Sequence, residues 1–296
     1  MSDERPPPAG WPFAVWSGPV YPGSMTETAA APVEIRIEGL TKAFDGHPVL
    51  RGVDLDIQAG AFVAVVGGSG CGKSVLLNHI LGLMQPDGGR VLVADPERPD
   101  SPLLDLATLD ADRMADIHVH WGVVFQRNAL FSGTVLDNIG LWLEEVGHLD
   151  VADIEHMAQR VLAAVGLPAT PDFLAGRVES LSGGMAKRIA IARALAMEPR
   201  CMFFDEPTTG LDPVTASQIQ DLLLSTHVDE GDRLARTTIV VTHDKDLLYR
   251  LRPRVVMLHD GRVSFDGPFE DFEASRSPII RPYFDLMPVL HQRELA

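Results

Sequence analysis

The sequence has few cysteines, few positive charges and no long apolar run, and each shortage excludes a class of protein. Cys71 and Cys201 are the only cysteines among 296 residues, too few for a disulfide framework, so a reducing cytoplasm is the expected compartment. Lys and Arg number 25 against 41 Asp and Glu, and the net charge of −16 disfavours binding to nucleic acid or to anionic lipid. No stretch approaches the roughly 18 apolar residues that a membrane-spanning helix needs. Action on a membrane would therefore require partner proteins.

The first 32 residues are rich in proline and glycine. They lack the positively charged start and the continuous apolar core of a signal peptide. Their composition predicts a disordered leader over residues 1–32. Because Met25 lies just before the first strand-like segment, we hypothesise that translation starts there, and finding residues 1–24 in the native protein by mass spectrometry would contradict this.

The glycine-rich segment at residues 67–74 has the pattern G-x-x-x-x-G-K-[ST]. It reads Gly67, Gly68, Ser69, Gly70, Cys71, Gly72, Lys73 and Ser74, after an apolar strand-like run and before a helical run that opens with Val75. Strand, glycine loop and helix in this order predict a phosphate site, because loop N–H groups and the positive end of the helix dipole converge there. Lys73 is expected to reach the β- and γ-phosphates, and the Ser74 hydroxyl to ligate Mg²⁺. The expected ligand is a nucleoside triphosphate.

Two later segments add polar groups at the ends of predicted elements. Ser182, Gly183 and Gly184 open a helix and repeat the anion-binding logic of the first loop, although taken alone they also fit an ordinary helix cap. A buried apolar strand from residue 201 ends in Asp205 and Glu206. Asp205 is expected to bind Mg²⁺ and Glu206 to polarise the attacking water, with a solvated turn as the alternative.

A strand predicted over residues 119–125 ends in Gln126, whose amide can donate and accept hydrogen bonds. A glutamine in this place is consistent with a structural role as well as a role in the site. His118 and His120 alternate along the same predicted strand and could ligate a metal, but no third ligand is suggested nearby.

Two more side chains are candidates for contacts with the nucleotide. His243 follows a β-branched strand at residues 238–241 and could contact a γ-phosphate, or it could be structural. Phe44 lies in a predicted hairpin turn at residues 44–47, upstream of the phosphate loop. It is expected to stack on adenine, with ordinary packing as the alternative.

In this order, these motifs make the chain resemble the ATP-binding subunit of ABC transporters over residues 33–275. The resemblance implies an α/β P-loop NTPase fold with a RecA-like core, an antiparallel β subdomain and a helical subdomain inserted at about residues 100–196. It also implies that a second copy of the chain closes over the nucleotide through its signature motif at residues 181–184 and through Asp212. The roles that the resemblance implies are catalysis by Glu206, His243, Gln126 and Lys73, Mg²⁺ binding by Ser74, Gln126 and Asp205, and ATP binding by Phe44, Gly67 to Val75, Ser182, Gly183, Gly184 and Asp212.

Finer features resemble the Mla-type branch, the ATPases of MCE-linked phospholipid transporters. Met185 stands where a glutamine is usual after Leu-Ser-Gly-Gly, and residues 125–138 also fit that branch. The resemblance implies phospholipid as cargo and a place on the cytoplasmic face of the inner membrane. Transmembrane permease subunits, an MCE-domain substrate-binding protein and a small STAS-domain subunit are the implied partners. An importer of a polar solute such as an amino acid is the alternative within the family, and a soluble ABC protein acting on DNA or ribosomes is the alternative outside transport.

The C-terminal tail over residues 276–296 carries an apolar stripe at helical spacing. The stripe consists of Ile279, Ile280, Tyr283, Phe284, Leu286 and Met287, with Ser277 and Pro278 as the expected helix start. Such a stripe must be buried, either on its own cassette or, as the resemblance implies, across the partner subunit.

Overall fold

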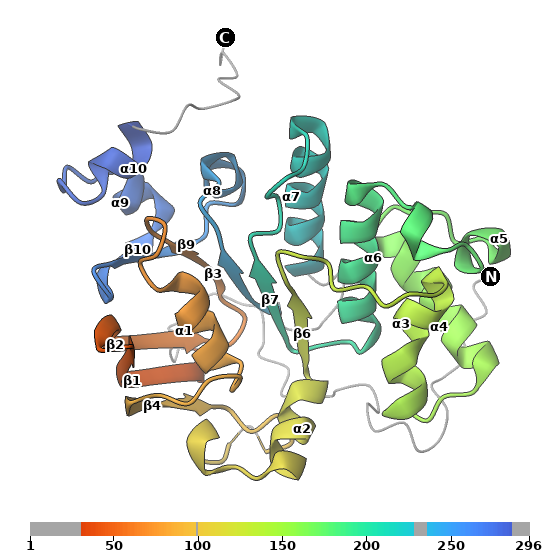
Figure 1. Cartoon of the computed structure of the whole chain (residues 1–296), viewed down its shortest axis with the longest axis horizontal. Helices are drawn as coiled ribbons and strands as arrows, with labels where there is room; N and C mark the ends of the chain where they lie inside the picture. The colour runs from red at the N-terminus through yellow and green to blue at the C-terminus, as the bar shows by residue number, and fades with distance from the viewer. Residues whose placement is uncertain (1–30, 99, 228–235, 286–296) are drawn as a thin grey trace, which may run out of the picture.

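The computed structural model describes residues 31–98, 100–227 and 236–285, and it consists of two sheets flanked by helices (Figure 1). The first sheet is antiparallel with the order β2-β1-β4-β5, and the second has six strands in the order β10-β9-β3-β8-β7-β6. The strands are β1 (Val33–Phe44), β2 (His47–Gln58), β3 (Phe62–Val66), β4 (Gly88–Val93), β5 (Leu104–Asp105), β6 (Trp121–Val124), β7 (Cys201–Asp205), β8 (Thr237–Val241), β9 (Arg254–His259) and β10 (Arg262–Pro268). The predicted α/β P-loop fold is confirmed.

The second sheet is parallel except at one edge, so its strand tips gather on one side. Strands β3, β6, β7 and β8 pair in parallel, β9 is parallel to β3, and only β10 runs antiparallel. Strand β8 is buried along its whole length, as its run of β-branched residues predicts. The carboxyl ends of β3, β6, β7 and β8 therefore bring four separate polar segments to one edge.

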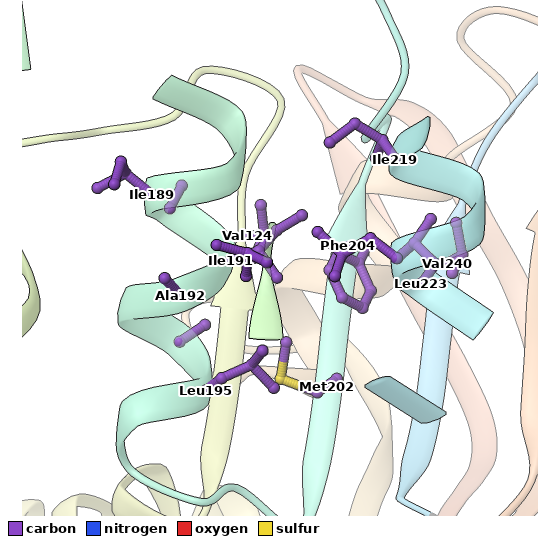
Figure 2. Close-up of a cluster of buried hydrophobic side chains, with 14 of the residues drawn as sticks. Val124, Ile189, Ile191, Ala192, Leu195, Met202, Phe204, Ile219, Leu223 and Val240 are labelled. Atoms are coloured by element: carbon purple, nitrogen blue, oxygen red, sulfur yellow. The ribbon is translucent and has the colours of Figure 1, made fainter. Parts of the chain in front are cut away.

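Alternate residues of these strands enter two different cores. In β7, Phe203 joins the core shared with the antiparallel sheet and α1 (Lys73–Ile80), while Phe204 joins the core formed with α6 (Gly183–Ala196) and α7 (Pro213–His227). Figure 2 shows the second core, where Phe204 lies between side chains of α6 and of α7. Both phenylalanines have no exposed surface. The sheet is thus held from both faces at the strand that carries the two carboxylates.

The helical subdomain comprises α3 (Val135–Glu145), α4 (Val151–Ala164) and α5 (Pro171–Leu174), and α6 joins it to the sheet (Figure 1). Helix α3 begins in a capping box, in which Thr134 and Asp137 each bind the other's backbone N–H. Strand β6 belongs to the six-stranded sheet, and the helices of this subdomain follow it in the chain, within the stretch predicted as an insertion at about residues 100–196.

The predicted strand over residues 119–125 is wrong at its start. Helix α2 (Ala111–Val119) includes the first residue of the predicted strand, and β6 begins only at Trp121. His118 therefore lies on a helix, where its Nε2 is 2.9 Å from the carbonyl oxygen of Leu81. His120 ends the helix as its C-cap, so the two histidines do not alternate on a strand.

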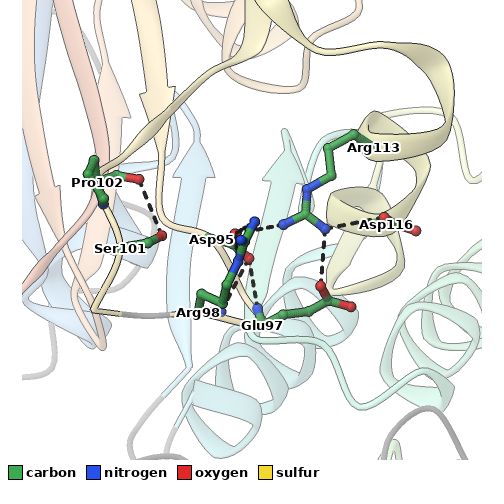
Figure 3. A network of polar contacts seen from close by, with 7 residues as sticks. All are labelled: Asp95, Glu97, Arg98, Ser101, Pro102, Arg113 and Asp116. Carbon is green, nitrogen blue, oxygen red and sulfur yellow. Dashed lines mark hydrogen bonds and ion pairs between the residues drawn. The ribbon is translucent and has the colours of Figure 1, made fainter.

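A network of ion pairs ties α2 to the loop that follows β4 (Figure 3). The side chain of Asp95 has no exposed surface, and its Oδ2 lies 2.6 Å from Arg113 and 3.0 Å from Arg98. Its Oδ1 accepts hydrogen bonds from two backbone N–H groups in the same loop. Arg113 also pairs with Glu97 and Asp116. A fully buried carboxylate is thereby satisfied on all sides.

The start of the C-terminal tail packs on its own chain. It follows the short helix α9 (Phe269–Ala274) and contains the short helix α10 (Arg281–Asp285), and Ile280 and Tyr283 are buried. The helix begins at Arg281, later than the expected start at Ser277, because Pro282 fits the first turn of a helix. Ile279, predicted as part of the buried stripe, is exposed instead, and Phe284 is half-buried. The last two stripe residues, Leu286 and Met287, lie outside the described residues, as does the leader up to residue 30.

Candidate active site

The glycine loop between β3 and α1 has a backbone conformation that favours glycine at three positions. Gly67, Gly70 and Gly72 have φ angles of 148°, 76° and 105°. A Cβ on Gly67 would lie 2.4 Å from the carbonyl oxygen of Leu258, so this position also excludes any side chain. Gly72 caps α1 without a side-chain bond, which leaves the N–H groups of the first turn available to an anion.

Lys73, the first residue of α1, folds back over this loop. Its amino group donates to the carbonyl oxygens of Gly67 at 2.9 Å and Gly68 at 3.1 Å. The charge thus lies at the mouth of the loop, where phosphate oxygens would compete for the same donor. Burial raises the pKa of the neighbouring Cys71 thiol, which disfavours its reactive thiolate form.

Asp205 at the tip of β7 is an incompletely satisfied carboxylate. Its Oδ1 is buried and has no hydrogen-bond partner within the part of the chain that the structure describes. Burial, followed by the charge of Glu206, raises the pKa of Asp205. A buried oxygen in this state fits a divalent cation, which would supply the missing partner. Among the described residues there is no cluster of three His, Cys, Asp or Glu side chains, so such a cation would depend on neutral oxygens as well.

Glu206 and His243 form a direct pair at the neighbouring strand tips. His243 Nδ1 lies 2.8 Å from Glu206 Oε2, which also accepts a hydrogen bond from Thr209 at 3.1 Å. The Glu206 side chain is 13% exposed and that of His243 is 49% exposed, so the pair reaches solvent from the imidazole side. Glu206 has a φ of 48°, and its N–H donates to Val241 on the adjacent strand. A carboxylate oriented by an imidazole is suited to activating a water molecule.

The residue after His243 holds this region together. Asp244 caps α8 (Lys245–Leu251) by accepting from the N–H of Leu247. Its Oδ2 accepts from Thr208 at 2.8 Å and from Gln220 of α7 at 3.0 Å. The strand tips of β7 and β8 are therefore linked through one carboxylate, which the sequence reading did not single out.

Lys187 is a second residue that the sequence reading missed. It lies on α6 with only 2% of its surface exposed, and its amino group donates to the carbonyl oxygens of Phe125 and Gln126 at 3.1 Å each. Burial lowers its pKa to about 8. Helical spacing was the available signal, because Ala190 and Ile191, three and four residues later, are buried on the same face. Gln126 itself is exposed beside the site.

The remaining predicted ligands are mostly open to solvent: Phe44, Ser182, Gly183 and Asp212 are exposed, and Gly184 is partly buried. Ser182 caps α6 through the N–H of Met185, and Asp212 is bound by Thr215 and neighbouring backbone groups. Within the described chain, no hydrogen bond or ion pair joins Ser182, Gly184 or Asp212 to the glycine loop. Phe44 is 41% exposed, with the amino group of Lys42 lying 5.8 Å from the ring centroid.

A parallel sheet whose strand tips carry a glycine loop, paired carboxylates and a histidine defines a P-loop NTPase. Residues 50–209 match the ABC transporter family. The chain is 32% identical over 264 residues to the protein TRIGALACTOSYLDIACYLGLYCEROL 3 of Arabidopsis thaliana, covering 85% of this chain and 73% of that protein. The lipoprotein-releasing system ATP-binding protein LolD of Anaeromyxobacter dehalogenans is 40% identical over 250 residues, covering 82% of this chain and 98% of LolD.

Further matches point to the same family. The histidine transport ATP-binding protein HisP of Pseudomonas aeruginosa is 35% identical, covering 84% of this chain and 96% of HisP. Among solved structures, a dimeric ATP-binding cassette in a post-hydrolysis state with ADP and Pi matches with a TM-score of 0.67 and 32% identity. The match covers 79% of this chain and 98% of that one. The chain belongs to the ABC transporter family as an ATP-binding and ATP-hydrolysing subunit. No helix within its described ranges is long and apolar enough to cross a membrane.

Proposed function

We propose that this subunit uses ATP to drive a membrane permease, with Glu206 and His243 as its hydrolytic pair. The observation that carries the proposal is their 2.8 Å contact beside Asp205, whose buried oxygen has no partner among the described residues. Glu206 orients the attacking water, and His243 fixes the carboxylate and faces the γ-phosphate. Lys73 leaves the carbonyls of its loop to bind the phosphates.

Mg²⁺ fits the residues present at the strand tips. Ser74, Gln126 and Asp205 would hold it, and a bound Mg²⁺ would neutralise charge on the β- and γ-phosphates. The unpartnered oxygen of Asp205 supports this assignment. Phe44, exposed on its hairpin, stacks on the adenine ring in this proposal.

We further propose that the active assembly is a dimer with shared sites. Ser182, Gly183, Gly184 and Asp212 of one subunit would close over the nucleotide held by Lys73 of the other. Within the described ranges of one chain, no hydrogen bond or ion pair joins these residues to the glycine loop, and this supports the arrangement, as does the dimeric state of the matching cassette structure.

For the cargo we propose phospholipid, moved by a complex attached to the cytoplasmic face of the inner membrane. Permease subunits would anchor this chain, and an MCE-domain protein and a STAS-domain subunit are the proposed accessory partners. The segment from Gly183 to Arg188 and the name of the Arabidopsis relative support a lipid. The name of the HisP relative favours a second candidate, an importer of a polar solute.

The hydrolytic assignment is tested with Glu206→Gln in the full-length chain. The substitution keeps the size of the side chain and removes the charged base, so turnover should fall by about 10²-fold or more while ATP still binds. Lys73→Ala should also weaken nucleotide affinity. The matched control is Glu155→Gln on the exposed face of α4, which should hydrolyse ATP normally. Near-normal turnover in Glu206→Gln would remove this residue from the role.

The cargo is tested by purifying the native complex and identifying its subunits and its bound lipid by mass spectrometry. Permease and MCE-domain subunits with phospholipid are the expected result. A complex that instead contains a soluble receptor loaded with an amino acid would replace the lipid proposal with the importer.

A further inference from the structure

The buried face of the C-terminal segment over residues 280–284 lies against α8, the helix that follows His243. The ring of Phe284 contacts that of Tyr249, with centroids 6.3 Å apart, and it contacts Phe272 of α9 at 5.3 Å. Tyr283 packs on Phe272 at 5.7 Å and is only 9% exposed. Burial, followed by the charges of Asp244 and Glu206, raises the pKa of Tyr283, which indicates that this segment lies near both carboxylates.

Lys245 joins this segment directly to α8. It is the first residue of the helix, and only 4% of its surface is exposed. Its amino group donates to the backbone carbonyl of Phe284 and lies 5.8 Å from the centroid of the same ring. A buried amino group needs such partners, because burying it without hydrogen bonds is strongly unfavourable. Docking of the segment therefore stabilises the position of Lys245.

The position of Lys245 bears on the hydrolytic pair because only Asp244 separates it from His243. On one side, Asp244 is fixed by Thr208 and Gln220. On the other side, Lys245 is fixed by Phe284. The turn that presents His243 to Glu206 at 2.8 Å is thus held between the core of the cassette and its C-terminal segment.

We infer that Lys245 is a positioning residue, through which the docked C-terminal segment holds His243 in contact with Glu206. This inference rests on the proposed roles of His243 and Glu206. When the segment is docked, the pair is preorganised for hydrolysis. When it is released, the turn at residues 242–245 relaxes and turnover falls, while the glycine loop and its affinity for ATP are unchanged. A displacement of about 1 Å at such a site can lower a rate by about 10²-fold.

The experiment measures kcat and KM for ATP, nucleotide affinity and thermal stability in full-length Lys245→Met and Phe284→Ala. Methionine keeps the length of the side chain and removes its hydrogen bonds, whereas Phe284→Ala removes the ring that anchors the segment. Both should lower kcat by about tenfold or more, with KM and nucleotide affinity essentially unchanged.

The matched control is Phe269→Leu, which loosens another buried ring that packs on α8, at Tyr249, one turn beyond Lys245. It should lower thermal stability without the loss of kcat. If it lowers kcat as much as Lys245→Met does, the effect comes from stability and the positioning role is wrong. If Lys245→Met does not fold, Phe284→Leu, a milder change, decides the question by the same kcat measurement.

Glu206→Gln, assayed alongside, separates this inference from the proposed function. If Glu206→Gln is inactive while Lys245→Met and Phe284→Ala turn over normally, the positioning role is overturned and the hydrolytic pair stands. If Glu206→Gln remains active, the pair itself is misassigned and the inference falls with it.

Discussion

Lys187 gives a prediction about stability that can be worked out from its surroundings. The residue is 2% exposed, and burial lowers its pKa to about 8, against about 10.4 in an unfolded chain. Between these values the unfolded chain binds more protons than the folded one. The free energy of unfolding therefore rises with pH in this window.

The size of the effect follows from the shift. A difference of about 2.4 pKa units corresponds to about 3 kcal/mol, which opposes folding at pH 7 and is largely relieved by pH 10. Lys187→Met removes this unfavourable term together with the two hydrogen bonds to the carbonyls of Phe125 and Gln126. Leaving those carbonyls without their donor costs about 1 to 3 kcal/mol. At pH 7 the variant should thus be close to wild type in stability.

The assay is urea unfolding of both proteins without nucleotide or Mg²⁺, at several pH values from 7 to 10. The thiols and tyrosines titrate in both proteins, so the difference between the two isolates Lys187. Relative to Lys187→Met, the wild type should gain about 2 kcal/mol over this range. A difference that stays constant with pH would refute the depressed pKa, and with it the account of Lys187 as a charge held between α6 and the loop at Gln126.

Four further substitutions test three other features. Ser182→Arg should abolish most ATP hydrolysis while fluorescent nucleotide still binds, because it obstructs the proposed closure between two subunits; unchanged turnover would contradict the shared site. Tyr283→Phe keeps the ring and removes a hydroxyl without a partner among the described residues, so urea unfolding should show equal stability or a gain of about 1 kcal/mol, and a clear loss would reveal a partner. Arg113→Met should lower the free energy of unfolding by about 3 kcal/mol, because it leaves the buried charge of Asp95 with one ion-pair partner fewer. Arg98 is more exposed, so Arg98→Met should lower the free energy of unfolding far less. Equal losses in the two variants would argue against this account of Asp95.

Most of the parallel sheet could be predicted from sequence because its strands are short apolar runs with polar tips. The β-branched run of β8 and the apolar run of β7 both predict strands, and both predict that these strands are buried. The failure at residues 118–120 has a physical reason. Alternating histidines and valine imitate a half-buried strand, but Asp110 caps a helix that buries Ile117 and continues to Val119.

The site could be predicted only where a motif concentrates its chemistry in a few adjacent residues. Glycine loops and paired acids have that property. Lys187, Asp244 and Lys245 do not, because each acts through a carbonyl or side chain that is distant in sequence or lies across an element boundary. Sequence reasoning also could not settle the tail, where burial of Ile280 and Tyr283 on the same chain shows how its first part packs.

Helix α6 packs on both the helical subdomain and the sheet, and this limits how the helical subdomain can move. This helix contacts α3 and α4 on one side and β6 on the other, and its buried alanines make part of one continuous core. A hinge needs a flexible segment with few contacts, and here the connection is a packed surface. Rotation of the helical subdomain relative to the sheet would therefore take the form of a small shear at this packed surface, where Ile191 and Leu195 of α6 face Val124 and Met202 (Figure 2). Larger side chains at these positions would obstruct the rotation of the helical subdomain even if the fold stayed intact.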